Sequence, residues 1–167
     1  MRHAIVLTAA FATLALAACG KSPSERLAEA AIEAGTGQKA DVDAKNGAVT
    51  IKTDKGEMKM TSGDTAALPA SFPKDVYLPE HYTVKSAMEM PNAMVLEIEA
   101  PGAVAALAAD AGKRMQAQGW KQQMAMAQTG QSQVLVYEKE KRSATLSFND
   151  NAGKGVTLGV QVATNQQ

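Results

Sequence analysis

Apolar and polar residues alternate in short segments along most of the chain from Ala40 to Val162, and residues typical of turns separate these segments. A period of two residues places every second side chain on the same face of a β-strand. Short segments of this kind, joined by tight turns, pair as antiparallel neighbours in a sheet. This alternation constrains the fold more than any other feature of the sequence.

The alternation is most regular in residues 81–167. Two alternating runs, Tyr82–Met90 and Met94–Ala100, precede a segment with apolar residues at helical spacing between Pro101 and Gly119. Further strands are predicted at Trp120–Met126, Val134–Tyr137, Ala144–Phe148 and Val156–Val162. The order β-β-α-β-β-β-β predicts an α+β fold, in which one helix packs across a face of an antiparallel sheet.

A short helix and a small β-meander are predicted ahead of this domain. Ser22-Pro23-Ser24-Glu25 has the residues of a capping box with proline at the first helical position, so we expect a helix over Pro23–Ala34 that ends at Gly35. Three short alternating strands follow between Ala40 and Met60, with Asn46-Gly47 as the first hairpin turn. A meander this small is marginal alone, so we expect its apolar face to pack on the helix or on the main domain.

The N-terminus has the pattern of an export signal. Met1-Arg2-His3 is short and basic, and the uncharged run from Ala4 to Ala18 is shorter than the roughly 18 residues of a membrane-spanning helix. Small residues at Ala17 and Ala18 suit a signal peptidase. An ordinary secretory signal followed by a coincidental cysteine is the alternative interpretation.

Leu16-Ala17-Ala18-Cys19 resembles the lipobox of bacterial lipoproteins. The resemblance covers the first 19 residues and implies that the Cys19 thiol receives a diacylglycerol. It also implies that the chain is cut before Cys19 and that the new amino group is acylated, for example with palmitate. Two or more acyl chains anchor a protein stably to a membrane. Gly20, in place of an aspartate, favours the outer membrane by the same resemblance, with the protein facing the periplasm.

The predicted organisation is a signal peptide over residues 1–18, a lipidated tether with the helix and meander over 19–65, and a connector over 66–80. The connector contains three prolines and is expected to lie along the body of the α+β domain, residues 81–167. The alternation, Gly119-Trp120 and the late meander are also similar to small bacterial envelope lipoproteins of unknown function. That similarity implies a style of fold and no activity.

Charge and residue types exclude several function classes. The 17 basic and 17 acidic residues balance, so no basic field attracts nucleic acid. A lipidated Cys19 leaves no thiol for a nucleophile or a zinc site. His81 is the only histidine beyond the signal and adjoins no nucleophile motif, while Glu97 and Glu99 occupy the solvent side of a half-buried strand. We therefore expect no catalytic residue and no cofactor.

Three Met-x-Met pairs remain open to two interpretations. The pairs are Met58/Met60, Met88/Met90 and Met124/Met126. In the predicted strand Trp120–Met126, Gln122 is expected on the same face as Met124 and Met126. Packing in the core is the first interpretation, because methionine fills irregular spaces well. The second is a metal site, because thioethers are soft ligands that suit Cu(I).

These observations predict a non-enzymatic, lipid-anchored protein of the cell envelope that binds another envelope component, with no role for nucleic acid. The alternative is a periplasmic copper-handling protein that uses the methionine pairs. A hydrolase would require a pocket that gathers His81 with acids distant in sequence.

Overall fold

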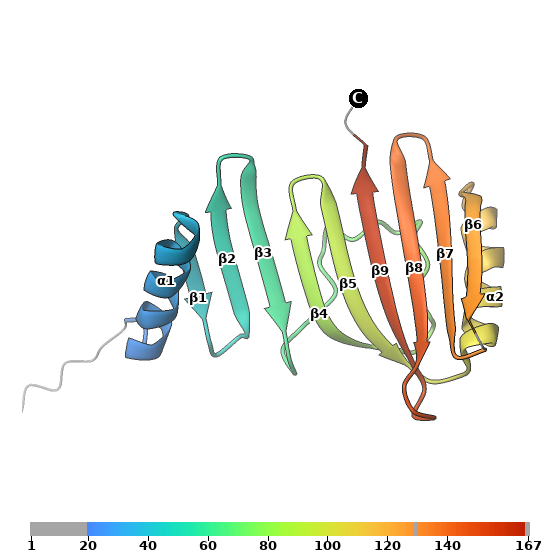
Figure 1. Ribbon diagram of the computed structural model, residues 1–167, viewed down its shortest axis with the longest axis horizontal. Helices are drawn as coiled ribbons and strands as arrows, with labels where there is room; N and C mark the ends of the chain where they lie inside the picture. Colours follow the sequence, from blue (N-terminus) through green and yellow to red (C-terminus); the bar gives the residue numbers. More distant parts are fainter. Residues whose placement is uncertain (1–19, 129, 166–167) are drawn as a thin grey trace, which may run out of the picture.

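The computed structural model describes residues 20–128 and 130–165, so the predicted signal peptide and Cys19 lie outside the described residues. The described chain forms two helices and one open antiparallel sheet of nine strands (Figure 1). The predicted α+β class and element order are confirmed. The elements are α1 (Pro23–Thr36), β1 (Ala40–Asp43), β2 (Ala48–Thr53), β3 (Gly56–Ser62), β4 (Thr83–Met90), β5 (Ala93–Ala100), α2 (Val104–Ala117), β6 (Lys121–Gln128), β7 (Ser132–Lys139), β8 (Arg142–Asp150) and β9 (Val156–Thr164).

The last strand lies in the middle of the sheet. The strand order is β1-β2-β3-β4-β5-β9-β8-β7-β6, so β9 pairs with β5 on one side and with β8 on the other. Its Leu158 stands between Ile98 and Phe148 in register. The two halves of the main sheet are therefore joined by hydrogen bonds to the final strand.

The predicted meander is continuous with this sheet. Strand β3 pairs with β4, with Met60 opposite Met88 and Thr61 opposite Ala87. The helix that precedes the meander contacts β1. The expectation that the apolar face of the meander packs against this helix is wrong, because α1 contacts β1 and its Glu25 and Glu29 bind the backbone N–H groups along the outer edge of that strand.

The first helix begins as predicted and ends later. The Ser22 hydroxyl accepts from the backbone N–H of Glu25 at 3.3 Å, and the Glu25 carboxylate accepts from the backbone N–H of Ser22 at 2.6 Å, which completes the capping box. The helix continues past Gly35 to Thr36. Gly37 ends it, because this residue adopts the left-handed conformation with φ of 70°.

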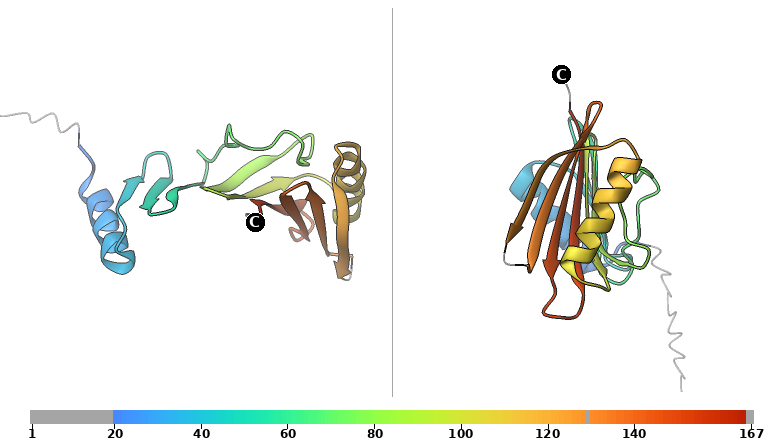
Figure 2. Two further views of the ribbon diagram at one scale, coloured as in Figure 1. Left: turned by 90° about the horizontal axis from the view of Figure 1, so that it is seen from above. Right: turned by 90° about the vertical axis from the view of Figure 1, so that its right-hand side faces the viewer.

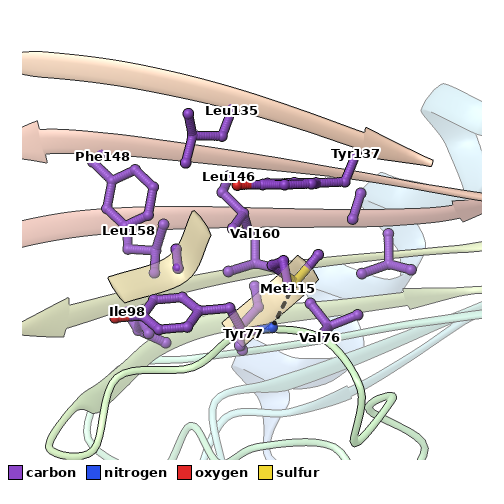
Figure 3. Close-up of a cluster of buried hydrophobic side chains, with 14 of the residues drawn as sticks. Val76, Tyr77, Ile98, Met115, Leu135, Tyr137, Leu146, Phe148, Leu158 and Val160 are labelled. Carbon is purple, nitrogen blue, oxygen red and sulfur yellow. Dashed lines mark hydrogen bonds between the residues drawn. The ribbon is translucent and has the colours of Figure 1, made fainter. Parts of the chain in front are cut away.

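The hydrophobic core lies on one side of the sheet. Alternating side chains of β5, β9, β8 and β7 meet α2 and the connector there, and Figure 2 shows α2 and the connector on the same side. Met115 of α2 is fully buried, and its sulfur accepts from the backbone N–H of Tyr77 at 3.2 Å (Figure 3). The buried aromatic residues are Phe72, Tyr77, Trp120, Tyr137 and Phe148.

Asp75 holds the connector to the β7–β8 hairpin. Its carboxylate binds the Lys139 ammonium at 2.7 Å and accepts two hydrogen bonds from Arg142, at 2.9 and 2.7 Å. Its backbone carbonyl accepts from the indole N–H of Trp120 at 2.7 Å, and the Arg142 guanidinium lies 4.9 Å from the centre of the Trp120 ring. The hydrogen bonds from Arg142 are the main cause that lowers the pKa of Asp75. A paired, hydrogen-bonded carboxylate thus attaches the connector, whose Phe72 and Val76 are buried.

Within residues 20–165, leaving aside 129, no helix has the length and apolar character that crossing a membrane requires.

Replacing Asp75 with asparagine should lower the free energy of unfolding by about 2 kcal/mol, because two cations lose a partly buried partner. Chemical denaturation at pH 7 measures this loss, with Asp64→Asn, at an exposed position between β3 and β4, as the matched control. The pKa of Asp75 is lower in the folded protein than in the unfolded chain. Its ion pairs therefore contribute fully to the free energy of unfolding above the unfolded pKa of about 3.9, and this contribution is lost as pH falls from there through the folded-state pKa. The difference between wild type and Asp75→Asn should therefore narrow below about pH 4. Equal stability of the two proteins at pH 7 would contradict this account.

Candidate functional site

One face of the sheet is uncovered in the part of the chain that the structure describes. The register defines a single row across all nine strands, composed of Val42, Val49, Met60, Met88, Val95, Gln161, Thr145, Val136 and Met124. The adjacent row, which contains Leu96, Val160 and Leu146, belongs to the core. Since neighbouring residues of a strand point to opposite faces, the first row lies on the face away from α2. We call this surface the open face.

All six methionines of the predicted pairs lie on the open face, as their register partners show. Met60, Met124 and Met126 are 38%, 48% and 53% exposed, so core packing is wrong for these three. In β4 the buried residue is Ala87, which is 3% exposed, and not its neighbour Met88. An alternating pattern shows that the two faces of a strand differ, but it does not show which face is covered.

Two of the three pairs come together and the third does not. Met60 stands opposite Met88 on the neighbouring strand, and Met58 and Met90 follow on the same face of these strands. We call these four residues the methionine cluster. Strands β5, β9, β8 and β7 separate β4 from β6, which places Met124 and Met126 about 24 Å away at a strand spacing of about 4.8 Å. A site that uses all six sulfurs is therefore not formed.

The methionine cluster continues into an apolar patch. Met60 is opposite Val49, Met58 is opposite Ile51, and Met88 is opposite Val95. Met58, Met88 and Met90 are half-buried in this patch. Directly opposite side chains on a sheet lie about 4.5–5.5 Å apart at their Cβ atoms, so the flexible thioethers of opposite strands can reach one another.

A bulge changes the face of β6 partway along. Gln122 pairs with Tyr137 on the core face, whereas Met124 pairs with Val136 on the open face, and the register shifts between them. The Tyr137 hydroxyl donates to the Gln122 side chain at 3.4 Å. The prediction that Gln122 shares a face with Met124 and Met126 is wrong, because the extra residue Gln123 reverses the alternation.

His81 lines an open depression of about 370 Å³ together with Glu99, Asn151 and Lys154. The structure thus brings one distant acid to the neighbourhood of the histidine. The Glu99 carboxylate is engaged by the Lys85 ammonium at 3.6 Å and by the Asn151 amide at 3.3 Å. Thr83 also lines the depression, but among the described residues no hydrogen bond joins His81 to Glu99 or to the Thr83 hydroxyl, so no oriented nucleophile–base pair is formed there.

No group of three or more His, Cys, Asp or Glu residues in the described ranges 20–128 and 130–165 is placed to hold a metal ion. Methionine sulfur is a further type of metal ligand. In this part of the chain, the methionine cluster is the one set of potential soft ligands that adjacent strands bring to the same surface.

Comparisons of the chain with protein-family models, with curated proteins and with solved structures found no match. The function is therefore argued from the surfaces described above.

Exposure predicts the order in which the methionines oxidise. Mild hydrogen peroxide should convert Met124 and Met126 to sulfoxides several-fold faster than Met94 and Met115, because the latter two are 9% and 0% exposed. Peptide mass spectrometry of the folded protein at successive times measures these rates. Similar rates at all four positions would show that the open face is covered in solution, and unfolded protein provides the control in which the rates converge.

Proposed function

We propose that the protein is a non-enzymatic binding module of the bacterial cell envelope, anchored by lipid on Cys19, that holds another envelope protein against its open face. The observation that carries this proposal is the one-sided sheet: one face bears the core, and the other bears exposed methionines. An exposed apolar patch on a folded domain commonly marks an interaction surface.

The composition of the open face indicates the chemistry of the partner. The methionine cluster forms one apolar patch, and Met124 and Met126 form a second with their neighbours Val134 and Val136. The strands between the two patches carry the uncharged polar residues Ser147, Thr145 and Gln161, and β5 adds the exposed carboxylate Glu97 in the row of Ser147. Such a face suits a protein segment with apolar side chains and polar groups, and methionine adapts its shape to the partner.

The proposed anchor lies close to the fold. Residues 20–22 precede α1, and three extended residues span about 10 Å, so a lipidated Cys19 holds α1 near the membrane surface. We expect the outer membrane as the location, with the protein facing the periplasm. The sheet extends away from α1 and remains accessible to a partner (Figure 1).

A photo-cross-linking amino acid at Val95, which is 36% exposed near the middle of the open face, should capture one discrete partner in intact cells. The same amino acid at the exposed Ala109 on α2 is the matched control and should not capture it. Val95→Arg should lower co-purification of that partner at least tenfold, or about 1.4 kcal/mol, while Ala109→Arg leaves it unchanged. The N-terminal peptide, read by mass spectrometry in the same sample, should begin at an acylated Cys19.

Equal capture from Val95 and Ala109 would contradict the assignment of the open face. An unmodified Cys19 would contradict the anchor independently of the partner.

A second candidate function is the binding of Cu(I), and the register of β3 and β4 favours it. Met60 and Met88 are directly opposite, and the remaining members of the methionine cluster lie one position along the same face. Several thioethers within reach of one point, half-shielded from water, suit a soft monovalent cation better than a hard or divalent one. This candidate needs four of the six methionines and leaves Met124 and Met126 out.

Titration of the protein with Cu(I) against a chromophoric chelator tests this candidate. The variant Met60→Leu/Met88→Leu should lose at least tenfold in affinity, because leucine keeps the volume and removes the sulfur. The matched control Met124→Leu/Met126→Leu removes two exposed sulfurs elsewhere and should bind like wild type. Equal losses in both variants, or no competition by wild type, would exclude a copper site at the methionine cluster.

A further inference from the structure

The two edges of the sheet differ in how their free backbone groups are satisfied. At the β1 edge, the Glu29 carboxylate accepts from the N–H of Val42 at 2.8 Å and the Glu25 carboxylate accepts from the N–H of Ala44 at 2.9 Å. The hydrogen bond from Ala44 is the largest cause that lowers the pKa of Glu25. For Glu29, the hydrogen bond with Lys21 lowers the pKa most, and the hydrogen bond from Val42 comes second. Helix α1 therefore covers this edge and occupies its donors, which prevents another strand from pairing there.

The opposite edge is free within the described residues. Strand β6 pairs with β7 alone and ends the strand order, and all eight of its residues are exposed. It lies at the end of the sheet remote from α1 (Figure 1). A strand of this length presents a row of unpaired N–H and C=O groups to which a further strand can bind.

The sequence of β6 lacks most of the features that prevent edge pairing. Lys-Gln-Gln-Met-Ala-Met-Ala-Gln contains one charge, at its first position, and no proline. The bulge at Gln123 disturbs the start of the strand, but Met124 to Gln128 pair regularly with β7. The part of the strand from Met124 to Gln128 is therefore a regular, uncharged edge.

We propose that two copies of this chain pair through β6, antiparallel about a two-fold axis at Ala125, so that one sheet runs through both protomers. In this register Met124 lies opposite the partner's Met126, and Ala125 lies opposite the partner's Ala125. Antiparallel pairing places residues of the same face opposite one another, and this register meets that requirement from Met124 to Met126, beyond which each strand reaches the partner's bulge at Gln123. The four methionines from the two copies then form two cross-strand pairs, one on each side of Ala125, and together one apolar patch across the junction.

The capped β1 edge explains why the occupant is a second copy and why the assembly closes. A head-to-tail contact of β6 with another chain's β1 would extend indefinitely, but Glu25 and Glu29 already occupy the β1 donors. Pairing of β6 with itself uses the remaining edge on both chains and leaves none. The proposed cleavage before Cys19 removes one basic residue, Arg2, and leaves a formal net charge of −1, so two copies approach with little long-range repulsion. Because the axis is normal to the sheet, both open faces point to the same side of the dimer.

Disulfide trapping in intact cells tests this pairing on the full protein. Cys19 is the only cysteine of the chain, so Ala125→Cys introduces a single thiol into the folded region. Opposite Cα atoms in antiparallel pairs lie about 4.5–5.5 Å apart, within the range that a disulfide spans, and the bacterial periplasm is oxidising. Ala125→Cys should therefore give a covalent dimer of twice the monomer mass on a non-reducing gel. Gln161→Cys, an exposed position in the centre of the open face, is the matched control and should remain monomeric.

Charge substitution then tests the register. Met124→Lys/Met126→Lys in the Ala125→Cys background places like charges opposite one another and should lower the dimer yield at least tenfold. Co-expression with the Met124→Glu/Met126→Glu version, carried on a chain of different mass, should restore a mixed dimer. Because both methionines are about half exposed, their replacement should leave the melting temperature unchanged. Measurement of the melting temperature therefore checks that the variants fold.

An absent Ala125→Cys dimer, an equal yield from Gln161→Cys, or a dimer that survives like charges would each overturn the proposal. A disulfide adduct with a mass other than twice the monomer would assign the β6 edge to a different protein. None of these outcomes affects the test at Val95, which reports on the open face alone.

Discussion

The insertion of β9 between β5 and β8 is the contact on which the rest of the structure depends. Without it, β4–β5 and β6–β8 would be two separate sheets, because β5 and β8 have no other common neighbour. Val156, Leu158 and Val160 of β9 are at most 1% exposed. Fully burying an aliphatic side chain stabilises a fold by about 1.5–3 kcal/mol, so this strand makes a large contribution to the core. The last strand in the sequence therefore lies in the interior of the sheet, between β5 and β8.

A core on one side only accounts for the surfaces that the protein presents. Helix α2 and the connector cover the side where β5, β9, β8 and β7 place their large residues, and the ion pair of Asp75 with Arg142 secures the connector there. The described chain has no second helical layer, so the other face carries smaller or more adaptable side chains. The methionines combine two roles: they lie opposite Val49, Ile51 and Val95 on neighbouring strands, and they stay partly or largely exposed on the open face.

The two edge strands of the sheet differ in their access to a further strand. A nine-stranded open sheet has two edges, and each is a potential site of uncontrolled association. Two glutamates of α1 satisfy the β1 edge, which also places the helix beside the predicted anchor. Only β6 is then available for a further strand among the described elements. A chain with one capped edge can associate through the other without forming a fibre, which links the position of α1 to the assembly proposed for β6.

The sequence by itself determined the local structure and the class of the fold. Period-two alternation and turn residues predicted every strand of the main domain, and Ser22, Pro23 and Glu25 predicted the start of α1, because these features act within a few residues of one another. The helix end was missed by two positions, since both Gly35 and Gly37 can end a helix and the left-handed conformation falls on Gly37. The sequence also indicated that the members of each Met-x-Met pair share a face.

Only the tertiary structure decided which face is covered, which strands are neighbours and which edge is free. The proximity of Met60 to Met88, the place of β9 and the bonds from Glu29 to Val42 all join residues distant in the chain. The bulge at Gln123 likewise depends on pairing with β7, and it reversed the predicted face of Gln122. Alternation records that a strand has two different faces. The contacts that bury one of those faces are made by other segments, and their choice depends on the free energy of the whole fold.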